Sequence, residues 1–227
     1  MIFALAQPVS LAGLLLAFVC SLALRSVVQR VLARRLVPGA TDRGPLFQLK
    51  RDADIFGFVG ALFGGTGWGR PAPLPEFHGG SRRPHDAGRR ALVLLAPPVL
   101  LIVLAQLVLA AYHTVANPTV LPFATPGNTL VGLPGPAADQ LVLSFAIGMM
   151  CWGILDLLPL PPLDGWGLLR LAVRHEGTGM QKARHWLVDQ NIGTAILVIG
   201  MLPFVGGVGL WVIVLDALGT PLLAPWR

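Results

Sequence analysis

Residues 156–165 read Asp-Leu-Leu-Pro-Leu-Pro-Pro-Leu-Asp-Gly, and this stretch decides how the chain is organised. It overlaps the end of an apolar run, residues 141–158, and its prolines end the helix that this run predicts, because proline disrupts the hydrogen bonding of a helix. Asp164 is then held at the depth of a membrane or just below it. An ionisable residue at that depth is costly without a partner, so Asp164 is a candidate functional residue. The alternative is a solvated aspartate in a turn beside Gly165.

The composition is that of a membrane protein. Of the 227 residues, 54% are hydrophobic and 12% are charged, whereas soluble domains carry about 25% charged residues. The mean hydropathy is +0.69. These values exclude an ordinary water-soluble enzyme, and also a disordered chain, which needs high charge and low hydrophobicity. The two cysteines, Cys20 and Cys151, are too few for a cysteine-based zinc site. We expect an all-α integral membrane protein that forms one polytopic domain over residues 1–227.

Apolar runs predict about four transmembrane helices, because a span needs about 20 predominantly apolar residues. The runs cover residues 9–32, 91–115, 141–158 and 192–218, and the last is interrupted near Pro203. Residues 54–63 are apolar but too short to cross a membrane, so they predict a re-entrant or interfacial element. Glycine and proline over residues 64–75 predict a turn or short hairpin after it.

The basic residues predict the topology. Of the 17 Lys and Arg, seven lie between Arg25 and Arg51, five between Arg70 and Arg90, and four between Arg170 and Arg184. Because short cytoplasmic loops collect Lys and Arg, we expect segments 33–90 and 165–190 to be cytoplasmic. The loop 116–138 and the N-terminus are then outside. This sorting explains the basic clusters without a nucleic-acid partner. The 15 Arg against 2 Lys, with abundant Ala, Gly and Pro, indicate a GC-rich bacterial genome, so we expect the chain in the bacterial inner membrane.

Three motifs resemble those of the site-2 proteases, which are intramembrane zinc metalloproteases. The family has an Asn-x-x-Pro-x-Pro-x-Leu-Asp-Gly run, which this chain matches with Asp156 in place of Asn and at Pro159, Pro161, Leu163, Asp164 and Gly165. The family's Gly-Trp-x-x-Pro-x-Pro segment is matched at Gly67, Trp68, Pro71 and Pro73, and its Ala-Gly-Pro by Ala96-Pro97-Pro98. The resemblance, over about residues 11 to 170, implies a site-2 protease-like core in which Asp164 stands at the position of the third zinc ligand.

The family's His-Glu-x-x-His motif is missing from this chain. In that motif the two His share one face of a helix and bind one zinc, while the Glu activates its water. Counting back from the matched residues 33–36, the three positions fall on Arg25, Ser26 and Gln29. A further His and Asp of the family correspond to Asp52 and Asp54. With at most one of three ligands kept, a zinc site of the family's type cannot form. We therefore predict no catalytic residue, no metal and no cofactor.

Arg25 suggests what replaces the metal. It would stand where a zinc ligand stood and face Asp164, so that a fixed guanidinium pairs with the carboxylate and keeps the first and third spans in register. A separation beyond about 6 Å would disprove this pairing. The alternative is that Arg25 extends to the membrane interface.

The function that the resemblance implies is that of a pseudoprotease. Such a protein would act as a scaffold or accessory subunit of a membrane complex, or as a regulator that binds a client transmembrane helix. The expected partners are other membrane-protein subunits, a client helix and lipid. Small residues favour close helix packing, so the fourth span is a candidate contact face through Gly200, Gly206, Gly207 and Gly209.

Two other functions stay open. An active intramembrane peptidase would need atypical metal ligands, drawn from His78, His85, His175 and Asp164. A small channel or transporter subunit would use Arg25, Gln29, Asp156 and Asp164 as polar groups along a path. Serine chemistry would need an activating partner, and the sequence offers no His beside Ser10, Ser26 or Ser144.

Overall fold

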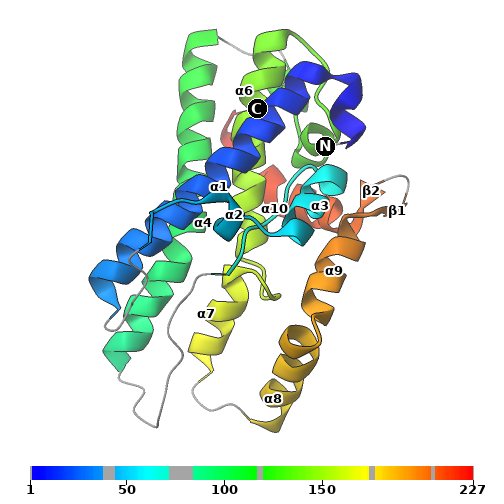
Figure 1. Cartoon of the computed structure of the whole chain (residues 1–227). Helices are drawn as coiled ribbons and strands as arrows, with labels where there is room; N and C mark the ends of the chain where they lie inside the picture. The colour runs from blue at the N-terminus through cyan, green and yellow to red at the C-terminus, as the bar shows by residue number, and fades with distance from the viewer. Residues whose placement is uncertain are drawn as a thin grey trace.

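The computed structural model describes residues 2–37, 44–71, 84–116, 120–173, 177–205 and 208–226, and most of them are helical (Figure 1). The α-helices are α1 (Pro8–Leu36), α2 (Leu49–Asp52), α3 (Ile55–Gly64), α4 (Pro84–Ala116), α5 (Pro126–Val131), α6 (Ala137–Asp156), α7 (Asp164–Ala172), α8 (Thr178–Arg184), α9 (Ile192–Met201) and α10 (Leu210–Leu223). The 3-10 and π turns are η1 (Ile2–Ala6), η2 (Leu121–Phe123), η3 (His185–Asp189) and η4 (Ala224–Trp226), and two strands are β1 (Pro203–Val205) and β2 (Val208–Gly209).

Three of these helices are long and apolar enough to cross a membrane: α1, α4 and α6. They correspond to the spans predicted over residues 9–32, 91–115 and 141–158, so the prediction of an all-α membrane protein is confirmed. The helices α1 and α6 run in the same direction and α4 runs against them (Figure 1). α6 is the central helix of the three. In its apolar 18-residue stretch 72% of the residues are buried, against 44% in α1 and 39% in α4.

Small residues let α1 and α6 approach closely. A β-carbon on Gly13 of α1 would lie 2.6 Å from the carbonyl oxygen of Leu141 and 2.9 Å from the β-carbon of Ser144. A β-carbon on Gly148 of α6 would lie 2.8 Å from that of Ala17. Helix pairs in membranes depend on such close packing, because lipid tails are as apolar as the helices themselves. These two glycines therefore set the spacing between the two spans.

α3 is a ten-residue helix whose flanking segments pair with each other. Its length, about 15 Å, is too short to cross a membrane, as residues 54–63 predict. Ala53 before the helix and Gly69 after it form an antiparallel bridge, so the chain enters and leaves side by side. Gly57 and Gly60 leave space for the buried Trp68, which packs against the helix. The structure thus has the turn-back geometry expected of a re-entrant element.

The prediction of a fourth crossing helix over residues 192–218 is wrong. The helix is interrupted at Pro203, as the sequence indicates, but β1 and β2 pair antiparallel there and the chain reverses. The indole N–H of Trp211 in α10 donates to the carbonyl of Ile196 in α9 at 3.2 Å, which requires the two helices to fold back together. With 10 and 14 residues, neither α9 nor α10 is long enough to span a membrane alone.

The glycines proposed as a partner-contact face serve this reversal instead. Gly200 lies against the ring of Trp211, and Gly209 lies against the backbone carbonyls of Gly200 and Met201. Gly206 and Gly207 lie outside the described residues. The small size of Gly200 and Gly209 is therefore used within the chain rather than for an external helix.

The segment 116–138 is more than a connecting loop. Its described part contains η2 and α5, and Leu121, Leu130 and Leu133 are buried in the core. The carboxylate of Asp216 in α10 accepts a hydrogen bond from the amide of Gly127 at 2.7 Å. This uncharged segment therefore folds back onto the bundle.

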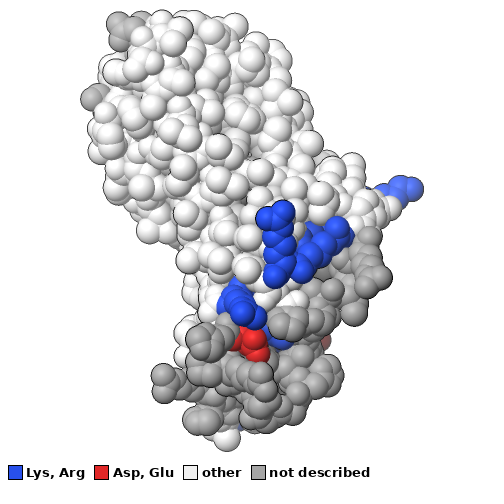
Figure 2. Space-filling view, turned by 90° about the vertical axis from the view of Figure 1, so that its left-hand side faces the viewer, with Lys and Arg blue, Asp and Glu red and all other residues white. Residues whose placement is uncertain are grey.

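Basic residues gather at one end of the bundle. α1 ends there with Arg34 and Arg35, α4 begins there with Arg89 and Arg90, and α7 ends there with Arg170 (Figure 1). Figure 2 shows blue side chains across the middle of the molecule and below it, and none in the upper part of the face that it presents. This distribution agrees with the predicted sorting of Lys and Arg to one side. That this side is cytoplasmic, and that the N-terminus is outside, stay predictions.

The close approach of α1 and α6 predicts that Gly13→Ala destabilises the protein by roughly 1–3 kcal/mol, because the added methyl group collides with backbone. Thermal unfolding in detergent measures the loss. Gly88→Ala is the matched control: a β-carbon on Gly88 in α4 meets nothing within 4 Å, so the same change there should be neutral or stabilising. Equal effects of the two changes would contradict the packing described for α1 and α6.

Candidate functional site

The centre of the site is the side chain of Arg25 in α1, which is 1% exposed. Its Nε donates to Oδ2 of Asp156 at 2.9 Å and to Oδ2 of Asp164 at 3.1 Å, and its Nη2 donates to Oδ1 of Asp164 at 2.7 Å. The predicted pairing of Arg25 with Asp164 is therefore confirmed, and the side chain does not extend to the membrane interface. Asp156 is a second partner that the sequence left unassigned.

Three more hydrogen bonds complete the cluster. The amide of Gln29, one turn along α1 from Arg25, donates to Oδ2 of Asp164. Nη1 of Arg25 donates to the carbonyl of Arg70 at 2.7 Å, and the backbone N–H of Asp164 donates to Asp156 at 3.3 Å. Four parts of the chain meet here: α1, the end of α6, the start of α7 and the segment that follows α3. Ser26, next to Arg25 in the sequence, is 6% exposed.

The proline-rich turn brings the two aspartates together. α6 ends at Asp156 and α7 begins at Asp164, and the turn between them contains Pro159 and Pro161. Gly165 lies against the carbonyls of Leu157 and Leu158, where any side chain would collide. The motif residues thus fold the chain back tightly enough for carboxylates eight positions apart to reach one guanidinium.

Burial makes these interactions obligatory. Arg25, Asp156 and Asp164 are each at most 2% exposed, and an ion taken out of water is costly unless its partners satisfy it. Two carboxylates share one guanidinium, so the donors from Gln29 and the amide of Asp164 supply stabilisation that the single cation does not. The fork of the guanidinium fits this role, because it presents five N–H donors in a fixed plane.

The Gly67-Trp68 motif holds the return segment that carries Arg70 to the site. The indole N–H of Trp68 donates to Oδ2 of Asp54 at 2.8 Å, and Asp54 also accepts from the amide of Phe56 at the start of α3. Gly67 packs against the backbone of α3 at Gly57. Pro71 follows and is exposed, and Pro73 lies outside the described residues.

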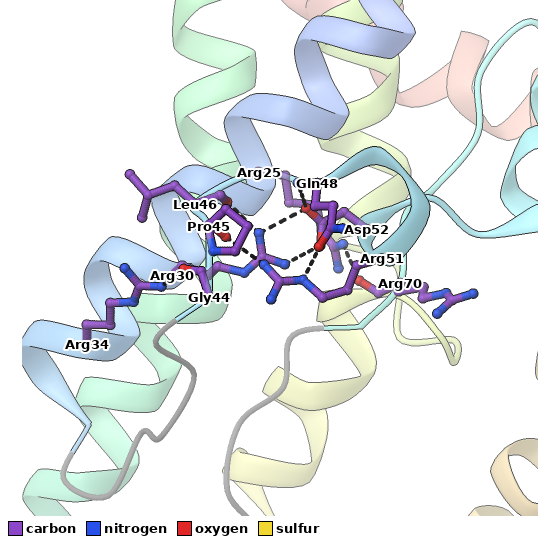
Figure 3. Close-up of polar contacts among 10 residues, drawn as sticks. All are labelled: Arg25, Arg30, Arg34, Gly44, Pro45, Leu46, Gln48, Arg51, Asp52 and Arg70. Atoms are coloured by element: carbon purple, nitrogen blue, oxygen red, sulfur yellow. Dashed lines mark hydrogen bonds and ion pairs between the residues drawn. The ribbon is translucent and has the colours of Figure 1, made fainter.

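A second ion pair, between Arg30 of α1 and Asp52 of α2, holds the segment between α1 and α3 against α1. Asp52 does not bind Arg25; its carboxylate accepts from the guanidinium of Arg30, from the amide of Gln48 at 2.8 Å and from Nε of Arg51 at 3.4 Å (Figure 3). Burial raises the pKa of Asp52, but the hydrogen bonds from Arg30 and Gln48 outweigh it and hold the pKa below its usual value. Asp52 and Asp54 therefore bond to Arg30, Gln48 and Trp68 rather than to Arg25.

Within the part of the chain that the structure describes, no group of three His, Cys, Asp or Glu side chains is placed to hold a metal. The ring of His113 lies 6.4 Å from that of Trp226, and His185 pairs with Asp189 on an exposed helix. The other candidate ligands His78 and His175 lie outside the described residues, and the side chain of His85 is not described. The hydroxyls of Ser10 and Ser144 bond to each other at 2.7 Å.

Comparison of the chain with protein-family models, with curated proteins and with solved structures finds no match. What the cluster can do follows from its chemistry. A permanently charged guanidinium on α1 joins carboxylates on α6 and α7, and this linkage fixes the relative positions of the three helices.

Removing the cation should destabilise the protein strongly. Arg25→Leu leaves two buried carboxylates without their counter-ion, and breaking a buried ion pair costs about 3–5 kcal/mol. Chemical or thermal unfolding in detergent measures the change. Arg35→Leu, at the exposed end of the same helix, is the control and should cost far less. If both variants unfold alike, Arg25 does not hold the site together.

The ion pair of Asp52 with Arg30 should make the stability of the protein depend on pH. Because its pKa is lower in the folded protein, Asp52 contributes stability that is fully present above the ordinary aspartate pKa of about 3.9 and is lost as the pH falls through the folded-state pKa. The stability difference between wild type and Asp52→Asn should therefore be largest near neutral pH and shrink below about pH 4. Melting temperatures across this range test it, with Asp189→Asn as an exposed control. A difference that stays constant with pH would contradict the assignment.

Proposed function

We propose that the chain is a metal-free relative of the site-2 proteases that acts as a scaffold or accessory subunit of a membrane complex. One observation carries this proposal. Arg25 and Gln29, at the positions that resemble the family's two zinc-binding His, both bind Asp164, which resembles the third ligand. The three positions converge on one point, as ligands around a metal must, and a guanidinium and an amide fill that point.

The chemistry of the substituted residues supports a structural role. A guanidinium stays charged at any physiological pH and accepts no proton, and an amide side chain is neither acid nor base. Ser26 stands where the family has its general base, and the described His113 and His185 lie against Trp226 and Asp189. The cluster therefore keeps the helices together, and the two carboxylates that could otherwise act as bases are bound to the guanidinium.

The surface supports a protein that works among lipids or other membrane subunits. Large apolar side chains are exposed on several helices of the bundle: Leu16 and Val19 on α1, Ile55, Phe56 and Phe58 on α3, and Val99, Val103 and Leu107 on α4. Exposed apolar surface of this extent is a contact face for lipid or for another membrane protein. The polar groups that a channel would need, from Arg25 to Asp164, bond to one another, which favours the scaffold over the channel.

Restoring the motif tests the relation to the site-2 proteases. The triple variant Arg25→His, Ser26→Glu, Gln29→His should bind about one zinc ion per chain, because two imidazoles one turn apart would then face Asp164. Metal analysis after dialysis, and the rise in melting temperature on adding zinc, both report binding. The same triple variant with Asp164→Asn is the matched control and should bind less. A triple variant that gains neither zinc nor zinc-dependent stability would contradict the correspondence of these positions.

The scaffold role is tested on the protein from its native membrane. After mild-detergent extraction, we expect a membrane-protein partner in fixed ratio and no stoichiometric zinc. Ser26→Ala should keep the partner, because the scaffold needs no nucleophile or base, whereas Arg25→Leu should lose it with the helix packing. Zinc near one ion per chain and no partner would instead support an active peptidase with atypical ligands.

A further inference from the structure

Ser21 of α1 and Trp152 of α6 face the same helix interface, one turn away from the ion cluster. Ala17 packs against Gly148, and Arg25 pairs with Asp156; the members of each pair are 131 positions apart. Ser21 and Trp152 have the same separation, four residues after the first pair and four before the second. Because the helices run parallel in constant register, these two residues lie opposite each other in the layer between.

Both residues bring a buried polar atom without a protein partner to this layer. Ser21 is 0% exposed and Trp152 is 1% exposed. Neither the hydroxyl of Ser21 nor the indole N–H of Trp152 finds a hydrogen-bond partner among the described residues. Buried polar groups in folded proteins are nearly always bonded to protein or to ordered water, since leaving one unpaired destabilises the fold.

Thr66 is a third residue with such an atom. It is 3% exposed, and its hydroxyl likewise has no partner among the described residues. The next residue, Gly67, lies against the ring of Phe18, and that ring meets the ring of Trp152 edge to face at 5.0 Å. The segment that carries Thr66 therefore packs against Phe18, which is a neighbour of Trp152.

We propose that Ser21, Trp152 and Thr66 form an internal site that binds ordered water. An indole N–H can only donate, whereas each hydroxyl can donate or accept, so the three groups can make three of the four hydrogen bonds of a water molecule. Buried waters typically make about three hydrogen bonds to groups of this kind. The site lies one helical turn from the Arg25–Asp156 pair, where water also offsets part of the cost of burying charge. This site requires neither a metal nor the proposed function.

A double-variant cycle tests the bridge between the two helices. Ser21→Ala should lower the ratio of folded to unfolded protein about two- to tenfold, because the water loses a partner. In the background of Trp152→Phe the same change should cost much less, since the water is already lost. Trp68→Phe is the control background: its indole is bonded directly to Asp54, so the loss from Ser21→Ala should persist there. A gain in stability from Ser21→Ala, or equal losses in both backgrounds, would overturn the proposal.

A direct measurement separates a bridging water from a side-chain contact between Ser21 and Trp152. With tryptophan labelled with ¹⁵N, magnetisation transfer in detergent micelles should connect water to the indole N–H of Trp152, which Trp152→Phe identifies. The buried indole of Trp68 should give no such signal, and the exposed Trp186 should give a strong one. Absence of transfer to Trp152 would overturn the water site, whatever the outcome of the cycle. Thr66→Val should weaken the transfer if the third partner is assigned correctly.

Discussion

One guanidinium, that of Arg25, binds parts of the chain that lie more than 130 residues apart. The end of α6, the start of α7 and the carbonyl of Arg70 each supply an acceptor, and each is delivered by a different local structure. Because an unpaired buried charge is strongly unfavourable, none of these segments can move away independently. The arrangement of the helices at this depth therefore depends on satisfying a single side chain.

That dependence works only because the helices are already close. The glycines at positions 13 and 148 set the distance between α1 and α6, and the register that follows places Arg25 opposite Asp156. The same register stacks polar layers along the interface, from the Ser10–Ser144 bond at one end to the ion cluster at the other. Packing of small residues and polar bonding are thus parts of one helix interface, in which each layer constrains the next.

The spans α1, α4 and α6 could be predicted from the sequence because length and hydropathy are local properties. The reversal between α9 and α10 could not, since an apolar run interrupted by proline fits either a kinked span or a hairpin. The contact of Trp211 with Ile196 decides between them, and it is tertiary. The pairing of Arg25 with Asp164 followed from opposite charges placed together by a resemblance. The sequence could not predict that the carbonyl of Arg70 accepts from Arg25, because every residue has a backbone carbonyl.

On the proposed relation to the site-2 proteases, the substituted positions form a chemically consistent set. A metal needs ligands with lone pairs, whereas a guanidinium needs hydrogen-bond acceptors. With Arg at position 25, the amide of Gln29 supplies a further donor to Asp164 without adding charge. On the same proposed relation, Asp156 stands in place of Asn and adds a second carboxylate, which shares the single N–H of Nε with Asp164. Arg25, Gln29 and the two aspartates satisfy one another, so the cluster is suited to hold α1, α6 and α7 together.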